Sequence, residues 1–345
     1  MLWLEESIID LLLKSNKLDI NIKDDVEKSA LMHAVFFDDP PFRIIKLVLD
    51  HNGVNITLKD RYGITALMIA SKLGLTGLVS ILPETPSISS DINTTDKFGR
   101  TALTNAAAMD HEGTVRMLLG LEDHEISIRY MYGRTAFMCS AKRNHVEIFE
   151  MLLAVTEINS KDTEGLTVLI HAAQQYHPKF VELLLHRKGI DINAQNKYGR
   201  TAVMYAAKRG NKAILGRLLN HQNIDINIKE CEGRTTLMDA PELGYISIVR
   251  TLLLLEGIDM NSKNNDGWAA WIQAARNFCT EIVQILLYQE DIEINEENNR
   301  ETAWTYKRDN EYTEIVNLLE SHHGFKPNLN HKEFNRRRKE SPASP

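Results

Sequence analysis

Two pairs of adjacent histidine and glutamate residues are the first candidates for chemistry in this chain. His111-Glu112 and His124-Glu125 begin like the helix of a zinc protease, in which two histidines four positions apart bind the metal. Val115 and Ile128, however, stand where the second histidine would have to be. Each place therefore lacks a ligand, and we expect no metal centre.

Nucleophilic or redox chemistry has no stronger support in the sequence. The three cysteines, Cys139, Cys231 and Cys279, form no C-x-x-C pair, and an odd number argues against a disulfide framework. A reducing compartment is the simpler interpretation. His171 and His177 lie six positions apart, and we interpret them as a structural turn or surface pair. No glycine-rich phosphate loop is present, so we expect neither an enzyme nor a bound cofactor.

The composition and charge limit the classes of partner. The chain has 345 residues, of which 43% are hydrophobic and 25% charged, as in an ordinary soluble protein. The net charge is -7, although the last 22 residues hold six basic and two acidic side chains. The body is thus more acidic than the whole chain, and a nucleic acid is not the partner we expect.

Targeting and membrane signals are missing at the sequence level. Glu5 and Glu6 occupy the region in which a secretory signal peptide would carry positive charge. No apolar run reaches 18 residues. We therefore expect no secretion and no membrane span.

A short sequence motif of the type Thr-Ala-Leu-Met recurs about every 34 residues. A period between about 20 and 50 residues indicates an array of stacked units, each of which buries its apolar face against its neighbours. The first residues of the successive copies of this motif are Ser29, Thr65, Thr101, Thr135, Thr167, Thr201, Thr235, Ala269 and Thr302.

Residues 196–229 show how one unit is built. Gly199 permits a positive φ in a tight turn, and Thr201 can cap the helix that follows it. Gly210 is placed to end that helix, after which apolar residues recur at helical spacing in a second, amphipathic helix. Residues 223–227 then return in an extended conformation to the next turn. Each unit is therefore predicted to be a helix, a turn, a second helix and an extended hairpin.

The recurring sequence motifs of these units also resemble those of a known protein family. Its motif runs D-x-x-G-x-T-P-L-H-x-A-A and closes on D-V-N, and this chain matches the start at 60–65 and 96–101 and the close at 191–193 and 225–227. On these residues the chain resembles the ankyrin-repeat family over roughly 5–321, with about nine repeats and an N-terminal half-repeat. The resemblance implies a curved, all-α solenoid of helix-turn-helix repeats with short β-hairpin-like loops. TPR arrays share the period, but they lack the glycine turn and the D-I-N tract.

The same resemblance divides the chain into three parts. We expect a capping half-repeat over 1–23, the array over 24–321 with an insertion at 83–91, and a disordered basic tail over 322–345. Within the array, Pro241 falls inside a predicted first helix, where proline removes a hydrogen bond. We therefore predict that the repeat over 230–263 is the least stable internal one.

In ankyrin arrays the hairpin tips and first helices line a concave face to which partners bind, so the resemblance implies a binding surface there. Basic and aromatic side chains recur at the tips, after the turn glycines and at the ends of first helices, and both types are common in binding hot spots. Some of these residues belong to the sequence Tyr-Gly-Arg-Thr, which is also a common sequence for the turn itself in ankyrin arrays. We call the set the basic–aromatic ladder: Arg61, Tyr62, Lys97, Phe98, Arg100, Tyr132, Arg134, Lys142, Arg143, Lys197, Tyr198, Arg200, Lys208, Arg209, Arg234 and Trp268.

These features predict a non-catalytic, monomeric scaffold or adaptor in the cytoplasm that binds a protein partner through an extended acidic segment. We expect no small-molecule substrate. The alternative is a nuclear regulator that docks onto a transcription or chromatin complex, since the run at 336–339 resembles a nuclear-import patch beside the proline-directed site Ser341-Pro342. Trp271 and Trp304 occupy core positions of predicted helices and are interpreted as packing residues.

Overall fold

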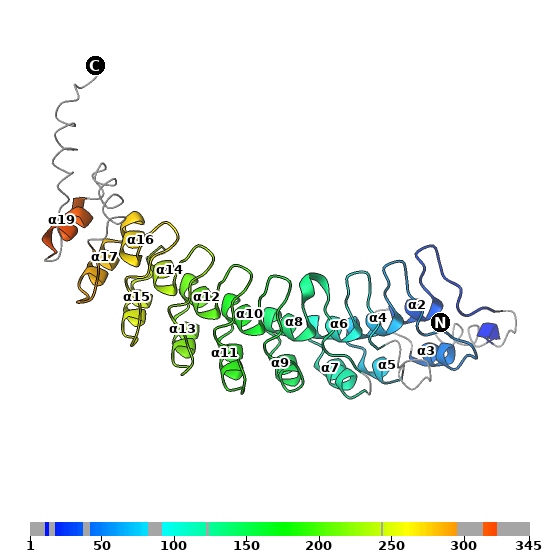
Figure 1. Cartoon of the computed structure of the whole chain (residues 1–345). Coiled ribbons are helices and arrows are strands. Elements are labelled where there is room, and N and C mark those ends of the chain that lie inside the picture. Colours follow the sequence, from blue (N-terminus) through cyan, green and yellow to red (C-terminus); the bar gives the residue numbers. More distant parts are fainter. Residues whose placement is uncertain are drawn as a thin grey trace, which may run out of the picture. The chain divides into compact units, whose positions relative to one another are not determined.

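The computed structural model describes residues 11–13, 18–36, 42–81, 92–121, 124–242, 244–294 and 313–322. The chain divides into two compact units, Met1–Ile190 and Asp191–Pro345. In each unit, helices follow one another in pairs, with hairpins on one side of the row of first helices and second helices on the other (Figure 1). Over the described ranges there is no strand, so the predicted all-α repeat fold is confirmed.

The first unit contains five helix pairs in the described residues. Within this unit, neighbouring first helices pack against one another, and each first helix packs against the second helix of its own repeat. The first helices are α2 (Ala30–Val35), α4 (Ala66–Leu73), α6 (Ala102–Ala108), α8 (Ala136–Arg143) and α10 (Val168–Gln174). The second helices are α3 (Phe42–Leu49), α5 (Thr76–Ile81), α7 (Glu112–Leu119), α9 (Val146–Leu153) and α11 (Pro178–Leu185), and a short 3-10 helix, η3 (Met131–Gly133), forms the fourth hairpin.

The second unit repeats the arrangement. Its described pairs are α12 (Ala202–Lys208) with α13 (Lys212–Leu219), α14 (Thr236–Glu242) with α15 (Ile246–Leu253), and α16 (Ala270–Arg276) with α17 (Thr280–Leu287). A last helix, α19 (Thr313–Ser321), packs against α17.

The recurring threonine, or Ser29 in the first repeat, caps most of the described first helices, although the hydroxyl of Thr235 has no partner before α14. The hydroxyl of Thr65 accepts a hydrogen bond from the backbone N–H of Met68, and Thr201 does the same for Met204. Such a cap satisfies one of the N–H groups that have no partner inside the helix. Ala269 cannot do this, and α16 has no side-chain cap.

Small residues in the first helices allow the close packing of neighbouring repeats. Ala106, Ala141 and Ala206 are fully buried, each in the middle of its helix. Larger apolar side chains of the second helices complete the core, as in the stacked rings of Phe149 and Phe180, whose centroids are 4.3 Å apart. Each repeat thus buries its apolar face against the next repeat of its unit, which is how a solenoid gains stability.

Where a repeat closes on asparagine, that side chain joins it to the next repeat of its unit. The amide of Asn227 donates to the carbonyl oxygen of Gly257 at 2.7 Å, and its Oδ1 accepts from the backbone N–H of Asp259 at 2.8 Å. Asn193 and Asn261 make the same pair of bonds within the second unit. These two hydrogen bonds explain why asparagine recurs at the end of the D-I-N tract.

Several sequence predictions concern residues outside the described ranges. These are most of the half-repeat over 1–23, the insertion at 83–91, Trp304 and nearly all of the tail over 322–345, including 336–339. In the first complete hairpin, where the turn glycine is missing, Glu27 adopts the left-handed conformation that glycine has elsewhere, with φ at 63°. Trp271 is buried in α16, as predicted.

Candidate functional site

The hairpin tips are held in place by an acceptor side chain at the start of each turn. Oδ1 of Asp60 accepts hydrogen bonds from the backbone N–H groups of Tyr62 and Ile64, at 2.8 and 2.9 Å. The same two bonds form in most of the other described hairpins, where the acceptor residue is Asp24, Asp96, Asp162, Asn196, Glu230 or Asn264. The D-x-x-G part of the motif is therefore the device that shapes the tip.

Backbone hydrogen bonds also join successive tips. The carbonyl oxygen of Tyr62 accepts from the N–H of Lys97 at 2.9 Å, and that of Phe98 accepts from Met131 at 3.0 Å. In the second unit the carbonyl of Tyr198 accepts from Cys231. These bonds fix the spacing of the tip side chains from one repeat to the next.

The aromatic tip residues of the ladder point largely into solvent. Tyr62, Phe98 and Tyr132, in three consecutive repeats of the first unit, are 51%, 45% and 58% exposed. Tyr198 is similarly exposed in the second unit. Cations lie over the faces of several of these rings, as where the Arg134 guanidinium is 5.2 Å from the centroid of Tyr132.

The arginines that follow the turn glycines have a structural role that sequence reasoning missed. Arg100 contacts the buried carboxylate of Asp96 at 2.7 Å, and Arg234 contacts buried Asp239 at 3.0 Å. Arg134 and Arg200 each lie 3.7 Å from the buried carboxylates of Asp162 and Glu230. Because these acids are buried, replacing such an arginine would leave a buried charge without its counterion.

The ladder residues fall into the two units. The first unit brings together three consecutive basic–aromatic tips with the exposed ends of first helices, which carry Lys142 and Arg143. Its members are Arg61, Tyr62, Lys97, Phe98, Arg100, Tyr132, Arg134, Lys142 and Arg143, and those of the second unit are Lys197, Tyr198, Arg200, Lys208, Arg209, Arg234 and Trp268.

Acidic tips interrupt the ladder, and sequence reasoning also missed them. Glu164 occupies the aromatic tip position in the fifth repeat, and Glu232 and Asp266 occupy it in the repeats that follow Tyr198. An alignment of the repeats with one another would have revealed these three acidic tip residues from the sequence alone. The longest run of basic and aromatic tips in the described residues therefore lies in the first unit, at Arg61-Tyr62, Lys97-Phe98 and Met131-Tyr132.

The buried pair Asp162–His171 shows how a hairpin is joined to its helix. Nε2 of His171 lies 3.0 Å from Oδ2 of Asp162. Burial by itself would raise the pKa of Asp162, but the hydrogen bond from His171 and those from backbone N–H groups outweigh it and lower the pKa below its usual value. His171 is thus a buried residue of α10 rather than part of a turn or surface pair, and only its Nε2 has a partner. His177 packs separately, edge-on against Phe180.

Comparison with known families decides the identity of the array. A family model described as "Ankyrin repeats (3 copies)" matches residues 4–90, 87–162, 111–196, 169–264 and 237–331, which together cover most of the chain. The chain belongs to the ankyrin-repeat family. Ankyrin repeats are generally protein–protein interaction modules, and proteins built from them are typically scaffolds without enzymatic activity.

Trp268 lies at the edge of a small polar recess in this ankyrin array. The guanidinium of Arg276 covers one face of its ring at 3.9 Å, and the side chain is partly buried. The recess has a volume of about 270 Å³ and is also lined by Glu232, Arg234 and Asp266. Trp268 therefore offers part of its ring, rather than a whole free side chain, to a partner.

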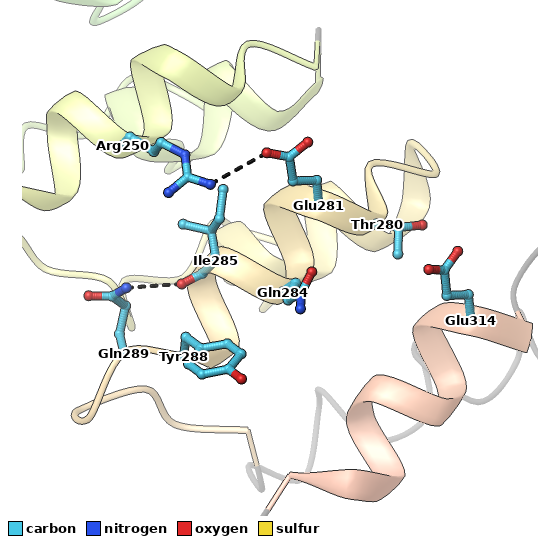
Figure 2. Close-up of a pocket in the computed structure, with 8 residues that line it drawn as sticks. All are labelled: Arg250, Thr280, Glu281, Gln284, Ile285, Tyr288, Gln289 and Glu314. Carbon is cyan, nitrogen blue, oxygen red and sulfur yellow. Dashed lines mark hydrogen bonds and ion pairs between the residues drawn. The ribbon is translucent and has the colours of Figure 1, made fainter.

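A wider recess of about 710 Å³ lies on the second-helix side of the second unit. Figure 2 shows Arg250 of α15 opposite Glu281 of α17, with their ion pair at 3.4 Å, and Glu314 contributed by α19. Tyr288 extends into solvent at its rim. The lining residues include the carboxylates of Glu281 and Glu314 but no histidine or cysteine, so among the described residues the recess offers no imidazole, thiol nucleophile or soft metal ligand.

Across the described residues, no group of three or more His, Cys, Asp or Glu side chains is placed to hold a metal ion. Within those ranges, no helix has both the length and the apolar character needed to cross a bilayer. None of the three cysteines forms a disulfide; Cys231 is exposed at a hairpin tip and Cys139 is buried.

Proposed function

We propose that this ankyrin-repeat protein is a non-catalytic scaffold or adaptor that binds a protein partner on its tip surface. The tip surface is the surface made by the hairpin tips and the first helices. The observation that carries the proposal is the run of three consecutive aromatic tips in the first unit, Tyr62, Phe98 and Tyr132, which are about half exposed. The first two tips also carry a basic residue. Exposed aromatic and cationic side chains on rigid supports are the residues that most often dominate protein interfaces.

Charge supports an acidic partner segment. Lys97 and Arg61 are exposed at the tips, and Lys142 and Arg143 are exposed at the end of α8. A positive surface on a chain with a net charge of -7 attracts an acidic segment selectively, because the rest of the protein repels it. The proposed partner chemistry is therefore an extended segment rich in Asp and Glu.

The test has to spare the arginines that neutralise buried carboxylates. We would replace Lys97, Lys142 and Arg143 by Glu, since all of them are exposed. A matched control replaces Lys46, Lys188 and Lys212 by Glu, which makes the same charge change at exposed sites on the second helices or their flanking loops. Affinity capture followed by mass spectrometry should lose its specific partners with the first variant and keep them with the control. Identical partner sets for the two variants would rule out the tip surface as the interface.

The proposed location is the cytoplasm, with a nuclear regulatory role as the second candidate. The basic run at 336–339 favours the second candidate on sequence grounds alone. Deleting residues 334–345 from a fluorescent fusion separates the two, because a nuclear role predicts loss of nuclear signal while a cytoplasmic role predicts an unchanged distribution.

A further inference from the structure

We propose that the ends of the first helices in the first unit form a second, apolar half of the binding surface, which receives apolar side chains of the same acidic partner segment. This inference rests on the proposed function and adds four residues and a partner chemistry that the basic–aromatic ladder does not contain, while one residue, Arg143, belongs to both sets. The surface is defined by one exposed large residue at or just after the end of each first helix. We call this set the helix-end row: Phe36, Leu73, Met109, Arg143 and Tyr176.

The helix-end row is not a scatter of isolated exposed residues. Leu73, Met109 and Arg143 each directly precede the left-handed residue of the turn between the two helices, and Tyr176 is that residue in its own repeat. Single exposed apolar residues are common on protein surfaces and need no explanation. A row in which four of five successive repeats expose a large apolar or aromatic side chain at nearly the same place is typical of an interaction site.

The backbone at Tyr176 gives an independent reason. The equivalent turn residues in the first unit are Gly74, Asp110 and Asn144, which are the residue types that tolerate a left-handed conformation. Tyr176 adopts the same conformation, with φ at 65°, although a bulky side chain disfavours it. Its side chain is 48% exposed. Backbone strain of this kind clusters at binding and active sites, which supports a contact for Tyr176.

The charges next to the helix-end row indicate which residues of the partner segment accompany its apolar side chains. Lys142 and Arg143 lie at the end of α8, and Arg61 and Lys97 lie at the tips beyond the other end of the first helices. The one acidic turn residue among them, Asp110, is paired with His145 at 2.9 Å. The occupant is therefore a partner segment in which Leu, Met or aromatic residues stand among Asp and Glu residues.

The spacing of the two rows fits a single segment. An eight-residue helix such as α8 is about 12 Å long, so a segment that crosses the row of first helices has the tips on one side and the helix ends on the other. Neighbouring repeats lie about 10 Å apart, and three of them span about 30 Å. An extended segment of roughly 10 residues covers that distance, at about 3.3 Å per residue.

The experiment uses a phage-displayed library of random peptides, each about 12 residues long, selected on the full-length protein. Enriched peptides should combine acidic with aliphatic or aromatic residues. The best peptide is then titrated against Tyr176→Asn, which installs the residue that Asn144 already provides at the equivalent position. We expect binding to weaken at least about tenfold while the unfolding midpoint stays the same or rises. The matched control Tyr288→Asn removes an exposed tyrosine on the second-helix side and should leave binding unchanged.

A second variant keeps the test independent of Tyr176. Leu73→Ser with Met109→Ser removes two exposed apolar contacts without touching a ladder residue, and it should also weaken the peptide. If peptide binding falls with the Lys97, Lys142 and Arg143 replacements but survives both helix-end variants, the helix-end row is overturned and the proposed function stands. If no peptide is enriched, or if the enriched peptides are insensitive to every one of these variants, both fail. A lower unfolding midpoint for Tyr176→Asn would show that Tyr176 is kept for packing and would also overturn the inference.

Discussion

Nε2 of His171 in α10 lies 3.0 Å from Oδ2 of Asp162, the residue that begins the hairpin nine positions earlier. Both side chains are buried, and Oδ1 of Asp162 accepts the backbone N–H groups of Glu164 and Leu166 at 2.9 Å each. Arg134, from the preceding hairpin, lies 3.7 Å from the same carboxylate. One buried carboxylate therefore ties together two consecutive hairpins and a first helix, so the shape of the tip depends on it.

The first prediction is that His171→Ala destabilises the first unit. The replacement removes a hydrogen bond from a buried carboxylate and leaves a small cavity, which we expect to cost about 1–3 kcal/mol. Urea unfolding monitored by circular dichroism measures the change. His186→Ala serves as the control, because His186 is an exposed residue just after α11 and its loss should change stability by less than about 0.5 kcal/mol. Equal stability of the two variants would contradict a structural role for the pair.

The second prediction concerns the pH dependence of stability. Burial raises the pKa of Asp162, but the bonds from His171, Leu166 and Glu164 outweigh burial and hold the pKa below the ordinary value of 3.8. The unfolded chain therefore binds this proton more readily than the folded one. It follows that the stabilisation is complete above pH 3.8 and is lost as the pH falls through the lower, folded pKa.

The Asp162→Asn variant tests the direction of this pH dependence of stability directly. The variant should be less stable than the natural chain at neutral pH, and the difference should shrink below about pH 4 as the natural carboxylate takes up its proton. Unfolding free energies measured from about pH 7 to about pH 3 give the two curves. Glu147→Gln, at an exposed position of α9, should run parallel to the natural chain. Parallel curves for Asp162→Asn would show that the carboxylate makes no pH-dependent contribution.

The repeat architecture could be predicted because each local signal agrees with the others. Threonine at the helix start, glycine in the turn, alanine in the first helix and asparagine at the close recur together, and each has one physical role in the structure. Gly199 illustrates this. Its φ is 75°, and a Cβ there would come within 2.9 Å of the backbone of Glu230. Only glycine satisfies both conditions without strain.

The partners of individual side chains could not be predicted in the same way. Arg100 and Arg234 occupy the same sequence position, yet the first contacts Asp96 four residues before it and the second contacts Asp239 five residues after it. Which carboxylate is buried beside each arginine depends on packing between hairpin and helix, which the motif leaves free. The exposed helix-end residues were missed for a different reason. Their apolar side chains fit the helical period and look like core residues until the exposure of Leu73 or Met109 is seen.

The third prediction concerns the asparagine that joins consecutive repeats. Asn227→Ala removes the bond donated to Gly257 and the one accepted from Asp259, so we expect a loss of about 1–3 kcal/mol. Asn223→Ala is the control, because Asn223 is exposed and contributes its backbone carbonyl, which the change preserves. Thermal unfolding should show a clearly lower midpoint for Asn227→Ala than for Asn223→Ala. Hydrogen exchange should locate the loss at the Asp259 amide, and unchanged protection there would argue against the bridge.

The fourth prediction concerns Pro241, which lies within α14. Six residues after the N-cap position, most of the other described repeats place a small buried residue, namely Ser71, Ala107, Ala141, Ala173, Ala207 or Ala275. Proline at this position cannot donate a hydrogen bond to the carbonyl of Leu237, and in a helix interior this costs up to about 3 kcal/mol. Because Pro241 is the sixth of seven residues in α14, we expect Pro241→Ala to gain about 1–2 kcal/mol and to raise the unfolding midpoint.

The reverse change gives the matched comparison for Pro241. Ala207→Pro places proline at the equivalent position of α12, in the neighbouring repeat, and should lower the midpoint by more than Pro241→Ala raises it, because Ala207 is fully buried. Hydrogen exchange adds a local measurement, since protection of amides in α14 and α15 should increase in Pro241→Ala and stay constant elsewhere. If Pro241→Ala leaves both the midpoint and the local protection unchanged, the repeat over 230–263 already accommodates the proline, and its lower stability is not explained by this residue.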